Sequence, residues 1–154
     1  MYQGKYNARQ NDSEVEEIEI ILDEGAFEPV RGHEDDAGAD LKSPFSCVIP
    51  ARGSVTIDTG VHMRIPAGYF GKLESKSGLN VNNSVVSLGG VIDSGYTGSI
   101  VAKLYNMSDT PYEINQGDKV VQIIIQPCAA VSFAKAKKFP KTSRGSNGFG
   151  STGR

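Results

Sequence analysis

A chain of 154 residues has the length of one domain, and a domain of this size folds without disulfides or a structural metal. Hydrophobic residues make up 38% and charged residues 22%, which excludes a disordered or fibrous protein. Apolar runs are too short for a membrane-spanning helix, and the first residues contain no apolar signal region. Two distant cysteines, Cys47 and Cys128, exclude a disulfide scaffold and indicate a reducing compartment, which we expect to be the cytoplasm.

The net charge of −2 conceals an uneven distribution along the chain. Residues 134–154 contain six basic residues and no acidic one, so their charge is +6, while residues 1–133 have a charge of −8. Duplex DNA binding needs a basic face on a folded domain, so the acidic body argues against a nucleic-acid partner. A basic tail can still meet a small polyanion.

In chain order, we expect a polar N-terminal arm over residues 1–16, a β-domain over 17–133 and a flexible C-terminal tail over 134–154. The β-domain repeats short β-branched runs that are separated by Gly, Pro, Asn and Asp. No window of about 12 residues carries a helical stripe. The pattern predicts an all-β, jelly-roll-like sandwich or barrel. The predicted strands span residues 17–22, 46–49, 54–58, 61–65, 69–74, 85–88, 99–105, 112–114, 120–126 and 130–133.

Two segments in the first half of the chain combine residue types that suit metal or phosphate chemistry. Residues 36–41 (Asp-Ala-Gly-Ala-Asp-Leu) form an acidic turn that can hold a carboxylate near such a cluster, although a solvated turn is the commoner outcome. Residues 75–79 (Ser-Lys-Ser-Gly-Leu) offer a hydroxyl, a cation and a close backbone approach, as a phosphate requires. A plain strand-end turn is the alternative, and the spacing is not that of a Walker A loop.

Two further segments carry polar residues in otherwise apolar or glycine-rich surroundings. In residues 89–98, Asp93 can hold a water as a general base and Tyr96 can pack against a sugar or base. The alternative is a hairpin with a core tyrosine. Gln122 interrupts an apolar strand, where a buried amide must find partners, and a structural hydrogen bond is its commoner role.

Residues 144–153 (Arg-Gly-Ser-Asn-Gly-Phe-Gly-Ser-Thr-Gly) form the most unusual segment. Their composition is that of a flexible linker, and no strand–helix pair flanks them, so the dinucleotide-binding fingerprint is not met. One Arg and one Phe among glycines and hydroxyls would also suit a flap that closes over a phosphorylated ring. His33 and His62 are isolated in the sequence and receive no role.

These five segments, in this order, resemble the five motifs of the trimeric dUTP pyrophosphatases (dUTPases) over residues 18–153. The resemblance implies hydrolysis of dUTP between the α- and β-phosphates to dUMP and pyrophosphate, assisted by Mg²⁺. Such an enzyme supplies dUMP for thymidylate synthesis and keeps uracil out of DNA. The resemblance also implies a homotrimer with active sites at subunit interfaces and a C-terminal tail that closes over them.

The resemblance further implies roles for individual residues. Asp93 is the catalytic base that holds the attacking water, and Asp40 supports the Mg²⁺ shell through water. Lys76 stands where the family usually has Arg, and Lys is a point charge where Arg is a bidentate fork. The triphosphate would be contacted by Ser77, Gln122, Ser151 and Thr152, with Arg144 at the γ-phosphate. The uracil edge would be read by the backbone of Gly90 and Val91, and Phe149 would lie over the uracil. Tyr96 would pack on the deoxyribose. The implied substrate-binding residues are Lys76, Ser77, Gly78, Gly90, Val91, Tyr96, Gln122, Arg144, Phe149, Gly150, Ser151 and Thr152.

Two other functions compete with this interpretation. The dCTP deaminases share the fold and resemble residues 92–98, but Lys103 stands where their deaminating Glu would lie, and they lack the glycine-rich final motif. A regulatory protein is the second alternative, because some members of the resembling family, notably phage-encoded ones, bind protein partners. The polar arm over residues 1–16 could serve such a partner, though no residue in it demonstrates one. For a phage-encoded chain, the compartment would be the host cytoplasm.

Overall fold

The computed structural model describes residues 17–147 and confirms an all-β fold, with one short helix in that range. Three strands have the predicted bounds: β4 (Ser54–Asp58), β6 (Tyr69–Glu74) and β10 (Tyr112–Ile114). The elements are β1 (Ile20–Leu22), β2 (Ala39–Lys42), β3 (Cys47–Ile49), β4 (Ser54–Asp58), β5 (Val61–Met63), β6 (Tyr69–Glu74), α1 (Ser77–Asn83), β7 (Val85–Ser87), β8 (Val91–Asp93), β9 (Val101–Asn106), β10 (Tyr112–Ile114) and β11 (Lys119–Pro127).

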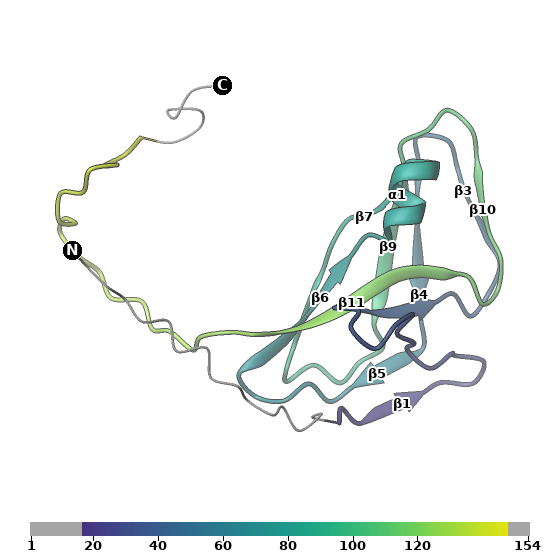
Figure 1. The fold of residues 1–154 in the computed structure, drawn as a ribbon, viewed down its shortest axis with the longest axis horizontal. Helices are drawn as coiled ribbons and strands as arrows, with labels where there is room; N and C mark the ends of the chain where they lie inside the picture. The colour runs from purple at the N-terminus through teal and green to yellow at the C-terminus, as the bar shows by residue number, and fades with distance from the viewer. Residues whose placement is uncertain (1–16, 148–154) are drawn as a thin grey trace.

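The strands form a four-stranded sheet of order β2-β11-β6-β8, a three-stranded sheet of order β4-β9-β7, and the pairs β1-β5 and β3-β10. Every one of these pairings is antiparallel. Figure 1 shows β11 crossing the middle of the molecule, with β1 and β5 at its lower edge. Strands far apart in the sequence, such as β2 and β11, are neighbours, which is typical of jelly-roll-like folds.

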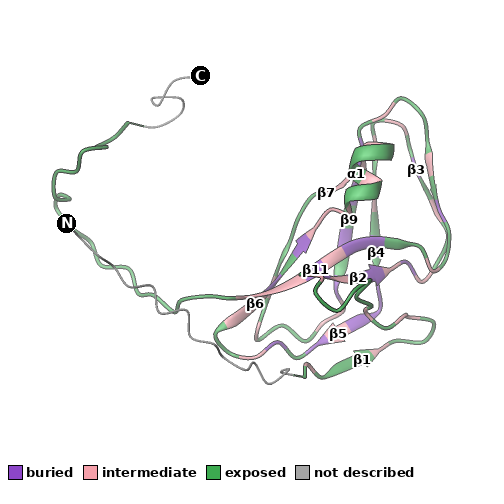
Figure 2. Ribbon diagram, viewed as in Figure 1, coloured by how far each residue is buried: buried purple, intermediate pink, exposed green. Residues whose placement is uncertain are grey.

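The core lies between the inner faces of these sheets. Along β9 the exposed Val101 and Lys103 alternate with the buried Ala102 and Leu104, as one buried face requires. The four-stranded sheet contributes residues such as Leu73 to the same core. Figure 2 marks the buried residues of these strands in purple. The opposite, outer face of the four-stranded sheet is therefore free to carry polar side chains.

Three local predictions were wrong. Residues 36–41, interpreted as a turn, lead into β2, and residues 75–79, interpreted as a strand-end turn, contain the start of α1. The helix has a sequence of low helix propensity (Ser-Gly-Leu-Asn-Val-Asn-Asn), and it ends at Ser84, which adopts φ 56° and donates its N–H to the Asn80 carbonyl. Residues 130–133 form no strand, because the chain has left the sheets there and offers them no pairing partner.

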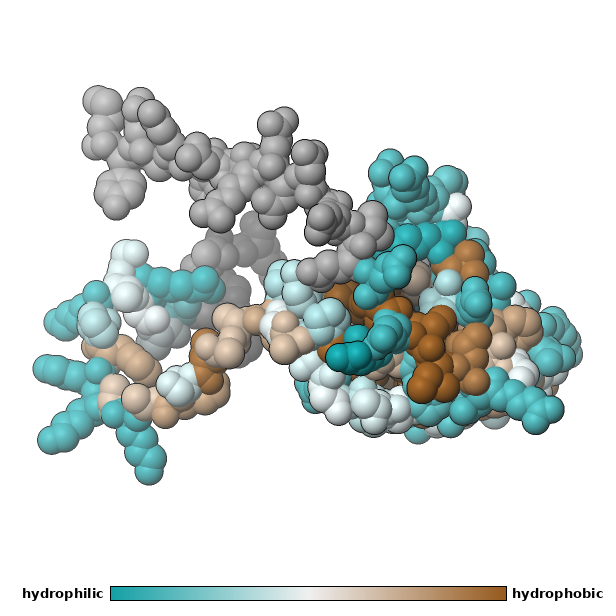
Figure 3. Space-filling model, turned by 90° about the horizontal axis from the view of Figure 1, so that it is seen from below, coloured by the Kyte–Doolittle hydropathy of each residue, from teal (hydrophilic) through white to brown (hydrophobic). Residues whose placement is uncertain are grey.

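The lower edge of the molecule carries an apolar surface between charged side chains, as Figure 3 shows from below. Ile20 and Ile21 of β1 belong to this surface, and the Ile21 residue is 71% exposed. Within residues 17–147 no helix is long and apolar enough to cross a membrane.

We predict that Asn106→Ala lowers the free energy of unfolding by about 2–3 kcal/mol, because a fully buried amide organises the β9–β10 turn. Its Nδ2 donates to the Ile49 and Thr110 carbonyls (3.3 and 2.7 Å), and its Oδ1 accepts from the Ser108 N–H and hydroxyl (2.9 and 2.7 Å). Urea unfolding measures the loss. The exposed Asn115→Ala is the control, and an equal loss in both variants would contradict the assignment.

Candidate active site

Several predicted site residues lie on the outer face of the four-stranded sheet. The register places Asp40 of β2 beside Gln122 of β11, and Gln122 beside Glu74 of β6. On β8, Asp93 lies beside Phe70 of β6. Phe70 and Glu74 share a face because they are four residues apart on one strand. The sheet therefore presents Asp40, Gln122 and Asp93 on the same side, opposite the core.

The first group of side chains centres on Asp40, whose side chain is only 9% exposed. The Lys76 ammonium donates to its Oδ1, and the Lys119 Nζ lies 2.9 Å from its Oδ2. Burial alone would raise the pKa of Asp40, but the hydrogen bonds and charges of the two lysines outweigh it and lower the pKa below its ordinary value of 3.8. The ion pairs therefore contribute to stability above that pH, and the contribution is lost as the pH falls through the lowered pKa.

A β-bulge in β11 brings Lys119 to this carboxylate. Lys119 pairs with Lys42 and Val121 with Leu41, so the strand contains one extra residue between these pairs. Both Val120 and Val121 are fully buried, and the bulge restores Lys119 to the outer face, where Asp40 lies. Sequence reasoning did not select Lys119, because its place depends on this irregular register.

Gln122 packs tightly beside the segment that carries Lys76. Its Nε2 donates to the Ser75 carbonyl at 3.1 Å, which is the structural hydrogen bond considered as its alternative role. A Cβ added at Gly38 would lie 2.6 Å from the Gln122 Oε1, so only glycine permits this approach. The exposed Ser77 and Gly78 follow at the start of α1. The first group thus combines Lys76, Lys119, Ser77, Gly78, Gln122 and the ionised Asp40.

The second group lines a pocket of about 260 Å³ beside β8. Gly89 and Gly90 both have positive φ (83° and 150°), which lets the chain turn closely onto β6. There the Leu73 N–H donates to the Gly90 carbonyl at 3.0 Å. The pocket is lined by Leu73, Gly90, Val91, Ile92, Asp93, Tyr96, Ser99 and Val101.

Tyr96 is held at the rim of this pocket and is 44% exposed, so the alternative of a core tyrosine is wrong. Its N–H donates to the Asp93 carbonyl at 3.0 Å, which closes a turn between the two residues. Its hydroxyl donates to the Ser99 carbonyl at 2.9 Å. The ring lies directly over Gly98, where an added Cβ would be 2.5 Å from the hydroxyl oxygen. Asp93 and Tyr96 therefore line one cavity, and the position of the ring depends on Gly98.

The two groups do not meet within one chain. Asp93 of β8 is opposite Phe70 of β6. Gln122 lies on β11, two strands away from β8, and is opposite Glu74 at the other end of β6. Standard strand rise and spacing put the Asp93 and Gln122 Cα atoms about 16 Å apart. Sequence reasoning selected both groups but had no register from which to derive this separation.

The described part of the C-terminal motif, residues 144–147, lies apart from both groups. Figure 1 shows residues 134–147 extending away from the sheets, and Arg144 is exposed, with its Nε donating to the Asn147 carbonyl at 3.0 Å. The other predicted residues of this motif, Phe149, Gly150, Ser151 and Thr152, lie outside the described residues.

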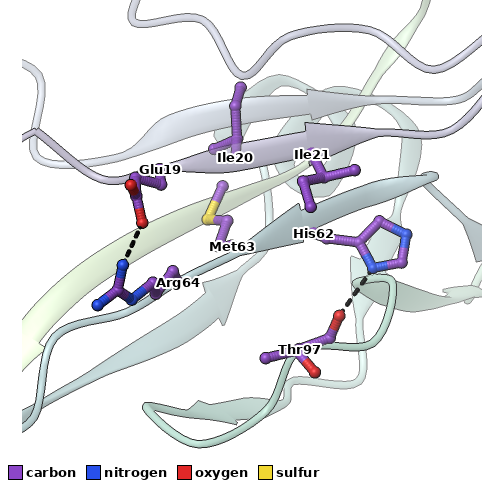
Figure 4. Close-up of a pocket in the computed structure, with 7 residues that line it drawn as sticks. All are labelled: Glu19, Ile20, Ile21, His62, Met63, Arg64 and Thr97. Atoms are coloured by element: carbon purple, nitrogen blue, oxygen red, sulfur yellow. Dashed lines mark hydrogen bonds and ion pairs between the residues drawn. The ribbon is translucent and has the colours of Figure 1, made fainter.

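His62, which received no role from the sequence, touches the loop that carries Tyr96. Its Nδ1 lies 2.8 Å from the Thr97 carbonyl oxygen (Figure 4). Its Nε2 lies 3.2 Å from Oδ1 of Asp23. Neither partner is close to His62 in sequence, so the contact could not be inferred from spacing.

The described residues offer no ready-made metal cage. Within residues 17–147, no three His, Cys, Asp or Glu side chains gather to ligate a metal ion. Mg²⁺ that is carried by phosphate oxygens and waters does not need such a cage, and the ionised Asp40 suits a contact through water. Each of its oxygens is bonded to one lysine, so a water would share the carboxylate with the two ammonium groups.

Comparisons with known proteins agree on one family. A family model described as dUTPase matches residues 26–153. The deoxyuridine 5'-triphosphate nucleotidohydrolase of Paramecium bursaria Chlorella virus 1 is 39% identical over 132 residues, which cover 86% of this chain and 94% of the viral protein. The probable deoxyuridine 5'-triphosphate nucleotidohydrolase of Schizosaccharomyces pombe is 36% identical with the same coverage.

Solved structures agree as well. The dUTPase of Staphylococcus bacteriophage 80alpha with dUPNHPP superposes with a TM-score of 0.85 at 27% identity, covering 90% of this chain and 99% of that one. A mutant dUTPase from phage phi11 of S. aureus, described with a structural Mg(II) ion, gives a TM-score of 0.76 at 28% identity, covering 80% and 99%. With the family model and these relatives matching nearly its whole length, the chain belongs to the dUTPase family of nucleotidohydrolases.

Proposed function

We propose that this enzyme hydrolyses dUTP to dUMP and pyrophosphate, with Asp93 as the base for the attacking water. The water oxygen bonds to the α-phosphorus, Asp93 accepts the proton, and the α–β bridging oxygen leaves with pyrophosphate. The observation that carries the proposal is the pocket that the exposed Asp93 lines together with Tyr96 and Gly90. A positioned carboxylate base typically contributes about 10²–10⁴-fold to such a reaction.

The pocket beside β8 takes the nucleoside in this proposal. The open backbone at Gly90 and Val91 reads the uracil edge, because positive-φ glycines leave the peptide groups uncovered. The Tyr96 ring packs against the deoxyribose, where a ribose 2′-hydroxyl would be crowded and left without a partner. The pocket therefore selects a deoxyribonucleotide by shape.

The group around Asp40 takes the triphosphate. Two ammonium groups against one ionised carboxylate leave a local excess of positive charge, which attracts a polyanion. Lys76, Ser77 and Gln122 then donate to phosphate oxygens, and Gly78 allows the close approach. Asp40 would hold Mg²⁺ through water, and the metal would supply charge neutralisation and orient the triphosphate.

We further propose a homotrimer in which Asp93 of one subunit faces the Asp40 group of another. The support is the separation of about 16 Å between the two groups on one sheet face, which standard strand geometry gives. The tail, with Arg144, Phe149, Gly150, Ser151 and Thr152, closes over the site. The extension of residues 134–147 away from their own sheets supports service to another subunit. In the cytoplasm of the cell or host, the enzyme provides dUMP and limits dUTP.

Product analysis tests the reaction. Incubation with dUTP, dCTP or UTP and Mg²⁺ is expected to give dUMP and pyrophosphate from dUTP alone. Formation of dUTP from dCTP would instead support the deaminase alternative. Orthophosphate as the primary product would contradict attack at the α-phosphorus.

We predict that Asp93→Asn lowers kcat by at least about 10²-fold while the Kd for dUTP stays within a few-fold of wild type. The amide has nearly the same shape but cannot accept the proton of the water. Single-turnover rates and equilibrium binding measure the two effects. Turnover close to wild type would remove Asp93 from the base role.

Mixing two inactive variants tests the shared site. We predict that Asp93→Asn and Gln122→Ala subunits, unfolded and refolded together, regain activity, because about a quarter of sites in random trimers combine an intact Asp93 with an intact Gln122. Each variant refolded alone is the control, and light scattering reports the trimer mass. Absence of any recovery in mixed trimers would place both residues in one subunit's site.

We predict that Gly98→Ala lowers the dUTP/UTP ratio of kcat/KM by about tenfold, because a Cβ there displaces the Tyr96 ring. Gly95→Ala is a matched control in the same loop, since no atom lies within 4 Å of an added Cβ at that position. Equal ratios in both variants and the wild type would show that the discrimination lies elsewhere.

A further inference from the structure

We propose that His62 is a positioning residue for substrate selection: as an imidazolium it ties the loop over residues 94–99, which carries Tyr96, to the β1–β5 pair. The inference rests on the proposed function, because it assigns the pocket beside β8 to the nucleoside. One part of the inference does not depend on the proposed function. This part is that His62 is protonated and holds the loop through its hydrogen bonds, and it is inferred from the contacts of His62 alone.

Both ring nitrogens of His62 face groups that can only accept hydrogen bonds. Figure 4 shows the side chain reaching from β5 to the loop, where Nδ1 meets the Thr97 carbonyl oxygen at 2.8 Å. Nε2 meets the Asp23 carboxylate at 3.2 Å. A neutral imidazole can donate from one nitrogen only, whereas the imidazolium donates from both. The arrangement therefore favours the charged ring, whose side chain is three-quarters buried.

The charges around His62 favour the same state. The hydrogen bonds to the Thr97 carbonyl and Asp23, with the charges of Asp23 and Asp58, raise the pKa of His62, and its partial burial opposes them less strongly. Asp23 comes from the turn after β1, and Asp58 ends β4. His62 also lines the pocket drawn in Figure 4, between β1 and β5. The other charged residues of that pocket are Arg64 and Glu19, which pair with each other at 2.5 Å. The loop itself presents the Tyr96 phenol and backbone carbonyls.

Asp23 is held in place for this contact by its packing against residue 60. The Asp23 N–H donates to the Gly60 carbonyl at 2.9 Å, and Gly60 has φ 67°. A Cβ at Gly60 would lie 3.3 Å from that of Asp23 and 2.8 Å from that of Ala26. The partner of His62 is thus fixed by backbone geometry.

The loop is fixed at both ends, but its middle depends on His62. At the C-terminal end, the Thr59 N–H and hydroxyl donate to the Ile100 carbonyl (3.0 and 2.7 Å), and the Ser99 hydroxyl donates to Asp58. At the N-terminal end, the Tyr96 N–H donates to the Asp93 carbonyl. Thr97, which directly follows Tyr96, is anchored across the molecule by the His62 ring.

The protonation state of His62 then controls how firmly Tyr96 is held. Below the raised pKa the imidazolium makes both hydrogen bonds. As the pH rises through that pKa, the neutral ring keeps one N–H, which the charged Asp23 carboxylate attracts, so the bond to the Thr97 carbonyl is lost. A looser Tyr96 crowds a ribose 2′-hydroxyl less. We expect the dUTP/UTP ratio of kcat/KM to fall about three- to tenfold from pH 6 to pH 9, the effect of losing one hydrogen bond.

Variants separate this role from a general structural one. His62→Gln keeps one donor but no charge, so its dUTP/UTP ratio is expected to be low and independent of pH. Asp23→Asn keeps the histidine but removes its carboxylate, so the pH midpoint of the ratio is expected to fall. His33→Ala is the control, because the other histidine is highly exposed and is expected to leave the wild-type pH dependence intact.

An NMR titration tests the anchor without any activity measurement. The ring resonances of His62 are expected to titrate above the ordinary histidine value, and the backbone amides of residues 94–99 are expected to shift with the same midpoint. A His62 midpoint at or below the ordinary histidine value, or a wild-type pH dependence in His62→Gln, would overturn the proposal. A protein that fails to hydrolyse dUTP but shows the titration would refute the proposed function and leave the anchor standing.

Discussion

The pairing of β11 with β2 on one side and β6 on the other is the constraint on which the rest of the structure depends. Its regular part aligns Asp40, Gln122 and Glu74 across the outer face and places Leu73 and Ile123 in the core. Its bulge buries two consecutive valines and returns Lys119 to the outer face. Because side chains alternate along a strand, a slip of one residue would bury the polar row and expose the core row. Packing of the apolar face thus fixes the outer face, which carries the proposed phosphate-binding group.

The glycines near the proposed site act through close approach rather than through flexibility. Gly38 admits the Gln122 amide, and Gly98 admits the Tyr96 ring, in both cases where a Cβ would be within 2.6 Å of the side chain. Each glycine therefore sets the position of one side chain of the proposed site. A substitution at either position would displace that side chain while leaving the apolar core in place, since neither glycine belongs to that core.

Short β-branched runs separated by Gly, Pro, Asn and Asp were enough to predict the fold class and the bounds of β4, β6 and β10. It failed where structure depends on distant partners. Residues 130–133 have strand-like composition but no strand to pair with, whereas β2 is held by β11 despite its small and acidic residues. The same limit applies to the site. The motifs selected Asp40, Asp93 and Gln122 as candidates from local sequence. The contacts of Lys119 and His62 depend on register and on long-range partners, which no local pattern records.

The separation of the two groups also suits the chemistry proposed for each. A carboxylate that must accept a proton is weakened as a base by neighbouring ammonium groups, because they lower its pKa. Asp40, bonded to Lys76 and Lys119, shows this effect within the same chain. If Asp93 of one subunit meets these lysines only across an interface, the triphosphate lies between them and its charge offsets theirs. The division between subunits would thus let one site hold a polyanion with lysines and still keep a carboxylate able to take a proton from water.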